Sequence, residues 1–457
     1  MDIALKKANA DKKQETILMT QGSILKQILL FSIPLILGNL LQQMYNTVDS
    51  VIVGNFVGSN GLAAVGSSTM IIYLLIAFGQ GAAIGAGVMT AQYLGAGNKA
   101  KVQTAVHTLA AIAIILGLVL TVGGVLFSRP LMVWMNTPAE ILDDAVLYMQ
   151  IYSAGMIFSA VYNIAAGILN AAGRSKLSLY YLAAASIVNI VLDLVLIVGL
   201  QMGVAGAAIA TGISQAVSCI LAVNFLMRVS ADYRVNWRKI ILERKMARRI
   251  IRIGLPTGVQ NMMISAANIL VQASVNGFGA AAVAGFGAYL KIDGFDILPV
   301  LSISMAITTF VGQNYGAGKL DRVRRGMWIS VAAGIIYTLA AGILLLIFSE
   351  EVMSLFTNDP EVIAFGQQAM WYFCPFYWIL SIMNILAGTV RGAGSSVPPM
   401  LVLIVSLCLF RFIWIQLAMP QLGSIDGLFI LYPISWLIGA GLMIIYTWKG
   451  SWLPTHH

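Results

Sequence analysis

Four aspartates lie inside stretches of sequence that are otherwise apolar: Asp49, Asp193, Asp293 and Asp296. A charged side chain in hydrocarbon costs at least about 2.5–3.5 kcal/mol on insertion scales, so an acid in such a stretch is a candidate functional residue by default. Two desolvated carboxylates can share a proton, and together with amide and hydroxyl oxygens they can also hold Na⁺. The chemistry to expect is therefore cation or proton binding, wherever two of these acids meet.

The elements that must position these acids are membrane-spanning helices. The chain has 457 residues, of which 59% are hydrophobic and 10% charged, against roughly 45–50% and about 25% in soluble domains. This excludes a water-soluble protein and predicts an all-α integral membrane protein. Windows of about 20 apolar residues predict twelve spans, near 24–53, 60–89, 102–128, 141–169, 176–199, 203–228, 248–277, 281–311, 324–349, 361–390, 397–421 and 424–449.

The positive charges define the orientation of these spans. Of the 27 Lys and Arg residues, 24 fall on one side of the predicted membrane. By the positive-inside rule this side is cytoplasmic, and it includes both termini and the connection between spans 6 and 7. The net charge of +9 thus reflects the basic residues that orient the protein in the membrane. No nucleic-acid partner is expected. The predicted divisions are an N-terminal segment (1–23), an N-lobe (24–228), a basic linker (229–247), a C-lobe (248–449) and a tail (450–457).

The chain repeats itself. AQYLGAGNKAKV (91–102) matches GQNYGAGKLDRV (312–323) at an offset of 221, and further matches run across most of both halves. Pro34 matches Pro256 at an offset of 222. Two six-span halves with the same orientation predict two lobes related by a pseudo-twofold axis along the membrane normal, an arrangement common in secondary transporters.

Asp49 and Asp193 share a predicted depth in the first half. Counted from the outer ends of their spans, Asp49, Asp193 and Thr211 all lie about 7–13 Å deep. Asn189 precedes Asp193 by four residues and shares its helix face, as Gln42 and Tyr45 do with Asp49. These residues predict one site for a proton or for Na⁺. The alternative is that both acids are structural and hydrogen-bond to neighbouring helices.

The second half lacks this acid pair but has charges of its own. The positions that match Asp49, Asn189, Asp193 and Thr211 are Val271, Phe410, Trp414 and Tyr432. Asp293 and Asp296 lie instead on one helix face, and Lys291 and Arg411 are the nearby basic residues in the spans. One interpretation is a structural salt bridge in which Lys291 or Arg411 neutralises an acid. The other is that these residues bind substrate or protons.

These features together resemble the multidrug and toxic compound extrusion (MATE) transporters, over roughly residues 20 to 450. The resemblance rests on the two six-span lobes, the Pro-bearing SIPLILGNLLQQMYNTVDS, the GAG-K turns after spans 2 and 8, and the ends AGILNAAGRS and AGTVRGAGSS. It implies a monomeric antiporter of the cell inner membrane. Such a protein has no cofactor and exports small amphipathic, often cationic compounds in exchange for H⁺ or Na⁺ by alternating access.

Within this family the chain resembles the DinF-like branch, which implies roles for individual residues. Asp49, Asn189, Asp193 and Thr211 would couple transport to H⁺ or Na⁺. The substrate cavity would be lined by Gln42, Tyr45, Tyr148 and Asn163, to which the charges of the second half add Asp293 and Asp296. Pro34 would permit a kink in the first helix, because proline removes one helix hydrogen bond.

Three other functions are alternatives to this one. A flippase for lipid-linked precursors shares the broader fold, but it would more readily show a cationic cavity and extra spans. An intramembrane enzyme needs a nucleophile–base or metal constellation, and the histidines His107, His456 and His457 supply none. A channel is separated from a transporter by saturation and counterflow. GQNYGAGKL is not a phosphate-binding loop, because Gln313 and Leu320 stand where that motif needs glycine and Ser or Thr.

Overall fold

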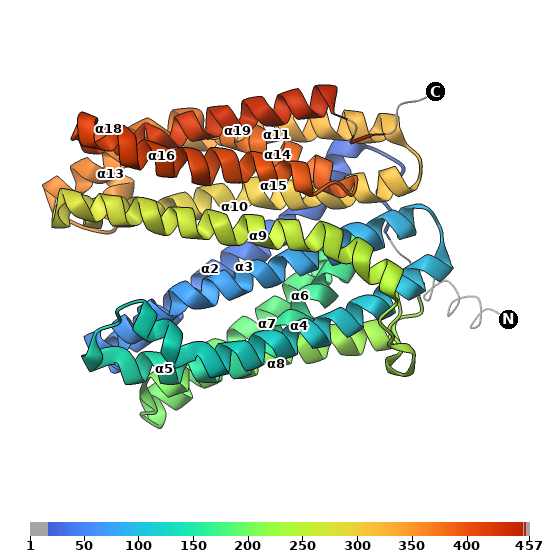
Figure 1. The fold of residues 1–457 in the computed structure, drawn as a ribbon, viewed down its shortest axis with the longest axis horizontal. Helices are drawn as coiled ribbons and strands as arrows, with labels where there is room; N and C mark the ends of the chain where they lie inside the picture. The colour runs from blue at the N-terminus through green and yellow to red at the C-terminus, as the bar shows by residue number, and fades with distance from the viewer. Residues whose placement is uncertain (1–16, 451, 454–457) are drawn as a thin grey trace. The chain divides into compact units, whose positions relative to one another are not determined.

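The computed structural model describes residues 17–450 and 452–453, and this part of the chain forms helices and no strand. The remaining residues, which include most of the predicted N-terminal segment and tail, lie outside the described part. The helices (Figure 1) are α2 (Ile24–Phe56), α3 (Ser59–Gly95), α4 (Lys99–Trp134), α5 (Ala139–Ala154), α6 (Met156–Ala171), α7 (Ser175–Asp193), α8 (Gly203–Arg228), α9 (Arg244–Val275), α10 (Ala280–Gly316), α11 (Leu320–Ile347), α12 (Ser349–Ser354), α13 (Pro360–Phe373), α14 (Tyr377–Gly392), α15 (Val397–Ile404), α16 (Phe410–Leu417), α17 (Met419–Leu422), α18 (Ile425–Phe429) and α19 (Leu431–Lys449). Two π-helical segments, η1 (Leu194–Gly199) and η5 (Val405–Leu409), and three 3₁₀ turns, η2 (Trp237–Lys239), η3 (Asn276–Phe278) and η4 (Cys374–Phe376), complete the order.

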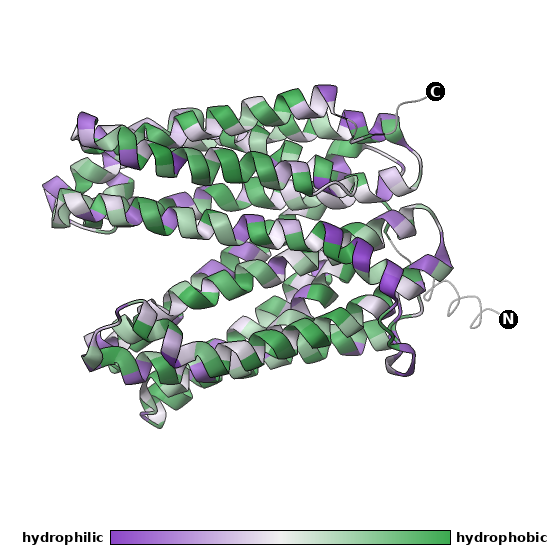
Figure 2. Ribbon diagram, in the orientation of Figure 1, coloured by the Kyte–Doolittle hydropathy of each residue, from purple (hydrophilic) through white to green (hydrophobic). Residues whose placement is uncertain are grey.

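The predicted membrane spans correspond to these helices, and hydrophobic residues cover most of their length (Figure 2). In the described part of the chain ten spans are long and apolar enough to cross a membrane, and α5 with α6, bent by 45°, makes an eleventh. The predicted span 248–277 is α9, which has 32 residues and is about 48 Å long at 1.5 Å per residue. It is too polar to meet the same test, since it carries Gln260, Asn261 and Asn268.

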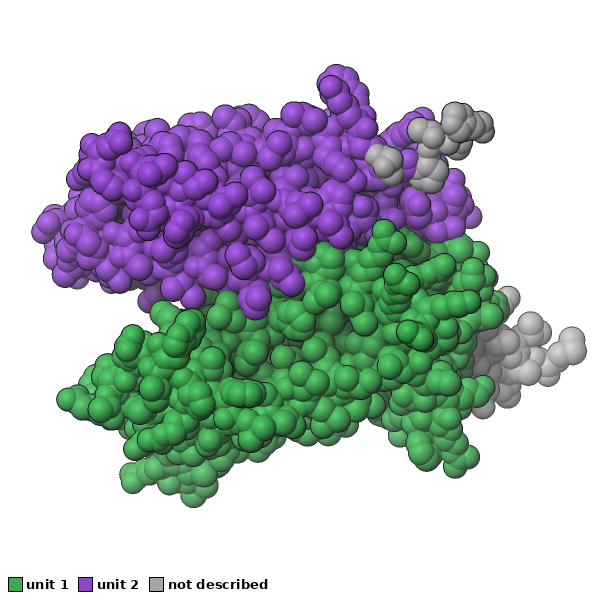
Figure 3. Space-filling model, in the orientation of Figure 1, with its two compact units in different colours: residues 1–19, 34–258 green, residues 20–33, 259–457 purple. Residues whose placement is uncertain are grey.

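The chain divides into two compact units (Figure 3), and the division falls inside two helices. Among the described residues, the first unit contains 17–19 and Pro34–Gly258, and the second contains Thr20–Ile33 and the residues from Val259 onward. The chain therefore passes from one unit to the other at Pro34 in α2, and again just after Gly258 in α9.

In the first unit, glycines bring the first part of α9 against α3. A Cβ built on Gly81 would lie 2.3 Å from the backbone nitrogen of Gly258, and one on Gly85 would lie 2.9 Å from that of Gly254. Such distances leave no room for any side chain, so the two helices pack backbone to backbone. Farther along, Arg249 donates from Nη1 to the Tyr93 hydroxyl at 2.9 Å.

In the second unit, the segment before Pro34 is held by the start of α11 and the turn that precedes it. Lys319 donates from Nζ to the carbonyl oxygen of Thr20 at 2.8 Å, and Arg322 donates from Nη1 to that of Gly22 at 3.0 Å. Arg322 also donates to the side chain of Gln27 at 3.3 Å. These contacts account for the place of Thr20–Ile33 in the second unit.

Backbone geometry repeats between the two halves of the chain. Four glycines with left-handed φ angles in the first half recur in the second at an offset of 220 or 221. The pairs are Gly58 (φ 94°) and Gly279 (96°), Gly97 (64°) and Gly318 (71°), Gly173 (78°) and Gly394 (95°), and Gly203 (59°) and Gly423 (61°). Glycine adopts this conformation without steric cost, which explains its presence at these turns. The GAG-K elements are accordingly tight turns.

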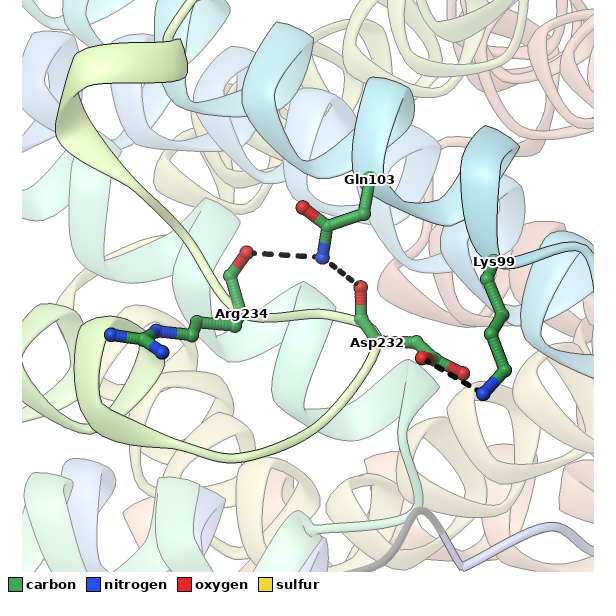
Figure 4. A network of polar contacts seen from close by, with 4 residues as sticks. All are labelled: Lys99, Gln103, Asp232 and Arg234. Atoms are coloured by element: carbon green, nitrogen blue, oxygen red, sulfur yellow. Dashed lines mark hydrogen bonds and ion pairs between the residues drawn. The ribbon is translucent and has the colours of Figure 1, made fainter.

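The predicted basic linker is packed against α4 in the first unit. Gln103 donates from Nε2 to the carbonyl oxygens of Asp232 and Arg234, and Lys99 forms an ion pair with the Asp232 carboxylate at 3.6 Å (Figure 4). His107 accepts at Nε2 from the backbone N–H of Asn236 at 3.0 Å. The Tyr233 side chain is fully buried in the core of this unit. The segment before α9 is therefore fixed to the first unit.

This packing predicts slow cleavage of the linker by trypsin, although Arg234, Arg238 and Lys239 lie in it. Cleavage requires local unfolding, and the Gln103→Ala/His107→Ala variant loses side-chain bonds to the linker that are worth about 1 kcal/mol each. We expect it to be cut roughly 30- to 100-fold faster. Thr104→Ala is the matched control, because within the described residues Thr104 bonds only to Ala100 in its own helix. Equal cleavage rates in the double variant and the wild type would contradict this packing.

Candidate functional site

The first unit brings together the four residues predicted to form one polar site. Asp49 lies on α2, Asn189 and Asp193 on α7, and Thr211 on α8. Asp193 is the last residue of α7, at the point where the π-helical segment η1 begins. π-helical turns inside helices occur frequently at functional sites. Asn189 donates from Nδ2 to Thr211 Oγ1 at 3.5 Å, which joins α7 to α8.

The site is buried, and its oxygen atoms lack hydrogen-bond donors. Asp193, Asn189 and Thr211 are 0%, 1% and 8% exposed. The carboxyl groups of Asp49 and Asp193 are neighbours that interact with each other electrostatically. Both carboxylate oxygens of Asp193, Oδ1 of Asp49 and Oδ1 of Asn189 are buried without a hydrogen-bond partner among residues 17–450 and 452–453.

Four buried oxygens without donors form an environment that a cation or a proton would stabilise. Leaving a buried polar atom unpaired costs about 1–3 kcal/mol, and more for a charged group. Carboxylate, amide and hydroxyl oxygens are the ligands that hard cations prefer. The site has two acids, and the described part of the chain has no cluster of three or more His, Cys, Asp or Glu side chains that could hold a metal ion. The donor set fits a monovalent cation or a proton, and the assignment to coupling stays a prediction.

Tyrosines surround the acid pair on three helices. Tyr45 is 9% exposed and Tyr148 4%, and both interact electrostatically with Asp49. Tyr73 on α3 and Tyr152 on α5 interact with Asp49 in the same way, and the rings of Tyr148 and Tyr152 lie 6.0 Å apart. Tyr73 and Tyr152 were not predicted from the sequence to lie at this site. The spacing of Tyr148 and Tyr152 by four residues on one helix was a signal that could have found the second of them.

Two predicted cavity residues lie less directly at this site. Gln42 is exposed and interacts with Tyr45 through their side chains. Asn163 on α6 is half-buried, and its Nδ2 donates to Ser159 Oγ at 3.4 Å. The structure shows no contact between Asn163 and either acid of the pair. Pro34 lies within α2 at the division between the two units.

In the second unit, tyrosines hold the two acids of α10. Tyr377 and Tyr289 both donate to Asp293 Oδ1, and the Tyr289 bond is 3.3 Å long. Tyr337 donates to the backbone oxygen of Asp296 at 3.2 Å and reaches its Oδ1 at 3.4 Å. Neutral hydroxyl donors thus stabilise these acids.

The direct salt bridge of the first interpretation is not formed in the described part of the second unit. Within residues 17–450 and 452–453, neither Lys291 nor Arg411 lies within 4.0 Å of a carboxylate. Lys291 is exposed, and its position two residues before Asp293 directs it to another side of the helix. Arg411 contacts Ser435, Asn268 and the ring of Tyr432 instead.

A family model decides the class of this protein. The MatE model matches the chain twice, over residues 34–195 and 256–415, which together make up well over half of it. The chain belongs to the MatE family. The two matches begin at Pro34 and Pro256, the prolines that the internal repeat aligns. Family membership confirms the resemblance and the prediction of a transporter rather than an enzyme.

Relatives of this MatE protein cover nearly its whole length. The probable multidrug resistance protein YpnP of Bacillus subtilis is 28% identical over 438 residues, which cover 95% of this chain and 97% of that protein. The probable multidrug resistance protein NorM of Thermotoga maritima is 26% identical over 444 residues, 94% of this chain and 93% of that one. An outward-facing multidrug resistance MATE transporter of the MOP superfamily matches with a TM-score of 0.86 at 24% identity, over 93% of this chain and 96% of its own. This likeness confirms the two-lobed all-α membrane fold.

Proposed function

We propose that this MatE protein is a multidrug efflux transporter, which exports amphipathic organic cations in exchange for H⁺ or Na⁺. The observation that carries the proposal is the set of buried, donor-free oxygens of Asp49, Asn189 and Asp193. Such a site is stabilised when a cation or proton enters it. The tyrosines around Asp49 supply flat aromatic faces, which attract organic cations by about 0.5–2 kcal/mol.

Coupling follows from Coulomb competition at the acid pair. An organic cation near Asp49 is attracted by the same negative charge that attracts H⁺ or Na⁺. Entry of the coupling ion from outside neutralises that charge and favours release of the drug. By linkage, the drug and the ion weaken each other's binding by the same factor. Alternating access between the two sides of the membrane then exchanges one for the other.

The proposal includes the setting of the protein. We propose that it is a monomer of the plasma membrane. We also propose that both termini are cytoplasmic, because 24 of its 27 Lys and Arg residues fall on one side of the predicted spans. The coupling ion is its only inorganic partner, and no cofactor is required. Assignment to the DinF-like branch stays a prediction.

Reconstitution into liposomes tests this function. With rhodamine 123 as the organic cation, an H⁺ gradient and a Na⁺ gradient are imposed separately, and dye accumulation is followed by fluorescence. We expect one of the gradients to drive uptake against the dye gradient, with saturation and counterflow. Protein-free liposomes are the control. Dye flux that ignores both gradients, or that does not saturate, would rule out a coupled antiporter.

A further inference from the structure

The second unit contains a buried cation whose environment calls for an anion. Arg411 on α16 is 3% exposed, and its hydrogen-bond acceptors are uncharged. Its Nε donates to Ser435 Oγ and its Nη1 donates to Asn268 Oδ1, each at 3.2 Å. The Tyr432 ring lies 4.3 Å from the guanidinium carbon. A buried charge is normally paired, because desolvation without a counter-ion costs several kcal/mol.

The guanidinium has donors left to offer. Among residues 17–450 and 452–453, Nη2 of Arg411 has no hydrogen-bond partner. This nitrogen is not completely buried. Asn268, which contacts the neighbouring Nη1, is an exposed residue. The Nη side of the guanidinium therefore keeps donors for a further acceptor, while Nε is bonded to Ser435. This is the geometry that binds a carboxylate through two parallel hydrogen bonds.

The nearest acid does not occupy this fork. Asp293 influences Arg411 electrostatically but lies beyond salt-bridge distance, and its Oδ1 is engaged by Tyr289 and Tyr377. Asp293 and Arg411 are thus held apart by separate sets of hydrogen bonds. Arg411 keeps a positive charge that is available to a ligand.

The internal repeat places Arg411 at the counterpart of the acid-pair site. At the repeat offsets, Asn268 corresponds to Asn46 on the helix of Asp49, and Arg411 to Ile190, one turn from Asp193. Ser435 corresponds to Ser214, which contributes the same local bond. Ser214 Oγ donates to the carbonyl oxygen of Thr211 at 2.8 Å, and Ser435 Oγ to that of Tyr432 at 2.7 Å.

The two sites therefore share a scaffold but carry opposite charge. In each site the charged residue lies on a helix next to a π-helical segment. Asp193 comes directly before η1, and Arg411 comes shortly after η5. One scaffold holds two carboxylates, and the other holds a guanidinium stacked on an aromatic ring. A site with the first charge suits cations, and a site with the second suits anions.

We propose that Arg411, with Asn268 and Tyr432, forms a subsite that binds the carboxylate of an aromatic, zwitterionic substrate. The Nη atoms bind the carboxylate, and the Tyr432 ring and its aromatic neighbours contact the flat part of the molecule. The rings of Phe373 and Trp436 lie 4.6 Å and 6.0 Å from that of Tyr432. This inference rests on the proposed export function and narrows its substrates from simple cations to molecules that also carry a carboxylate.

A pair of dyes that differ in one group tests the subsite. Rhodamine 110 has a free carboxylate, and rhodamine 123 is its methyl ester. Binding of each to the purified full-length protein is measured by fluorescence polarisation in detergent, without any ion gradient. Because a charge-assisted pair of hydrogen bonds is lost, Arg411→Gln should weaken rhodamine 110 binding roughly 10- to 100-fold and rhodamine 123 binding no more than about twofold. Arg129→Gln, at an exposed ion pair with Asp143, is the matched control.

A second variant covers the case in which Arg411→Gln does not fold. Asn268→Asp keeps the size of the side chain and places a carboxylate beside Nη1, where the Asn268 oxygen lies at 3.2 Å. This internal acid should compete with the ligand and selectively weaken rhodamine 110 binding by about tenfold.

The outcomes separate this proposal from the export function. Equal losses for both dyes, unchanged binding of both, or no binding of rhodamine 110 to the wild type would each overturn the subsite. Gradient-driven uptake of rhodamine 123 tests only the export function, and dye binding without a gradient tests only the subsite, so either can fail alone.

Discussion

Asp193→Asn is expected to abolish ion-coupled transport while leaving the protein at least as stable as the wild type. The substitution preserves the shape of a fully buried side chain. It removes one of two facing carboxylates and introduces an amide donor beside the donor-free oxygen of Asp49. We expect gradient-driven dye uptake to fall about 100-fold. In alkaline Na⁺-free buffer, stability should rise by about 1–2 kcal/mol, as is common when strained functional sites are neutralised.

The two readouts distinguish a functional acid from a structural one. A structural Asp193 would make its variant less stable, since a buried hydrogen-bonded partner would be lost. Thermal unfolding of the purified protein measures the change in stability. Measured with and without Na⁺, it also reports on the coupling ion. Na⁺ should stabilise the wild type only if it binds at this site. Asp143→Asn, at an exposed acid, is the matched control. Uptake above half the wild-type rate would remove Asp193 from the coupling site.

Gly81→Ala is expected to destabilise the first unit far more than a methyl group added to α3 at a position with open space around it. The added carbon would lie 2.3 Å and 2.4 Å from backbone atoms of Gly258, and 2.6 Å from the carbonyl oxygen of Gly254. Backbone atoms cannot rotate away as a flexible side chain can, so α3 and α9 must separate. Overpacking of this kind costs about 3 kcal/mol.

The same helix supplies the control for this prediction. Gly66 also lies in α3, and a Cβ built on it has no neighbour within 4 Å. Gly66→Ala should be neutral or stabilising by up to about 1 kcal/mol, because alanine favours a helix over glycine. The test compares the thermal unfolding midpoints of the two variants and the wild type, measured side by side in detergent. If Gly81→Ala unfolds at the same temperature as Gly66→Ala, the close packing of α3 on α9 is refuted.

Most of the fold could be predicted from the sequence, because the bilayer imposes length and polarity on every span. The span predicted at 203–228 is α8, Gly203–Arg228, and that at 176–199 is α7 with η1. The bend between α5 and α6 could not be predicted. It falls at Gly155, where an added Cβ would lie 3.1 Å from the Cα of Gly212 on α8. Sequence periodicity carries no information about such a neighbour.

The acid pair could be predicted for a similar reason, but the contacts of Arg411 could not. Asp49 and Asp193 share a depth, and depth can be counted along a helix. The contacts of Arg411 depend on how a long side chain turns between α9 and α19, and residue counting cannot establish that direction. The division of the chain inside α2 and α9 likewise depends on packing, which continuous helical patterns conceal.

That division has a consequence for the modularity of the molecule. Thr20–Ile33, encoded in the first half, completes the second unit, and residues 244–258, encoded in the second half, complete the first. A chain severed in the linker would yield two fragments, each lacking a piece of its own unit and carrying a piece of the other. Neither duplicated half is therefore a self-contained module, because each contributes a segment to the compact unit that the other mainly builds.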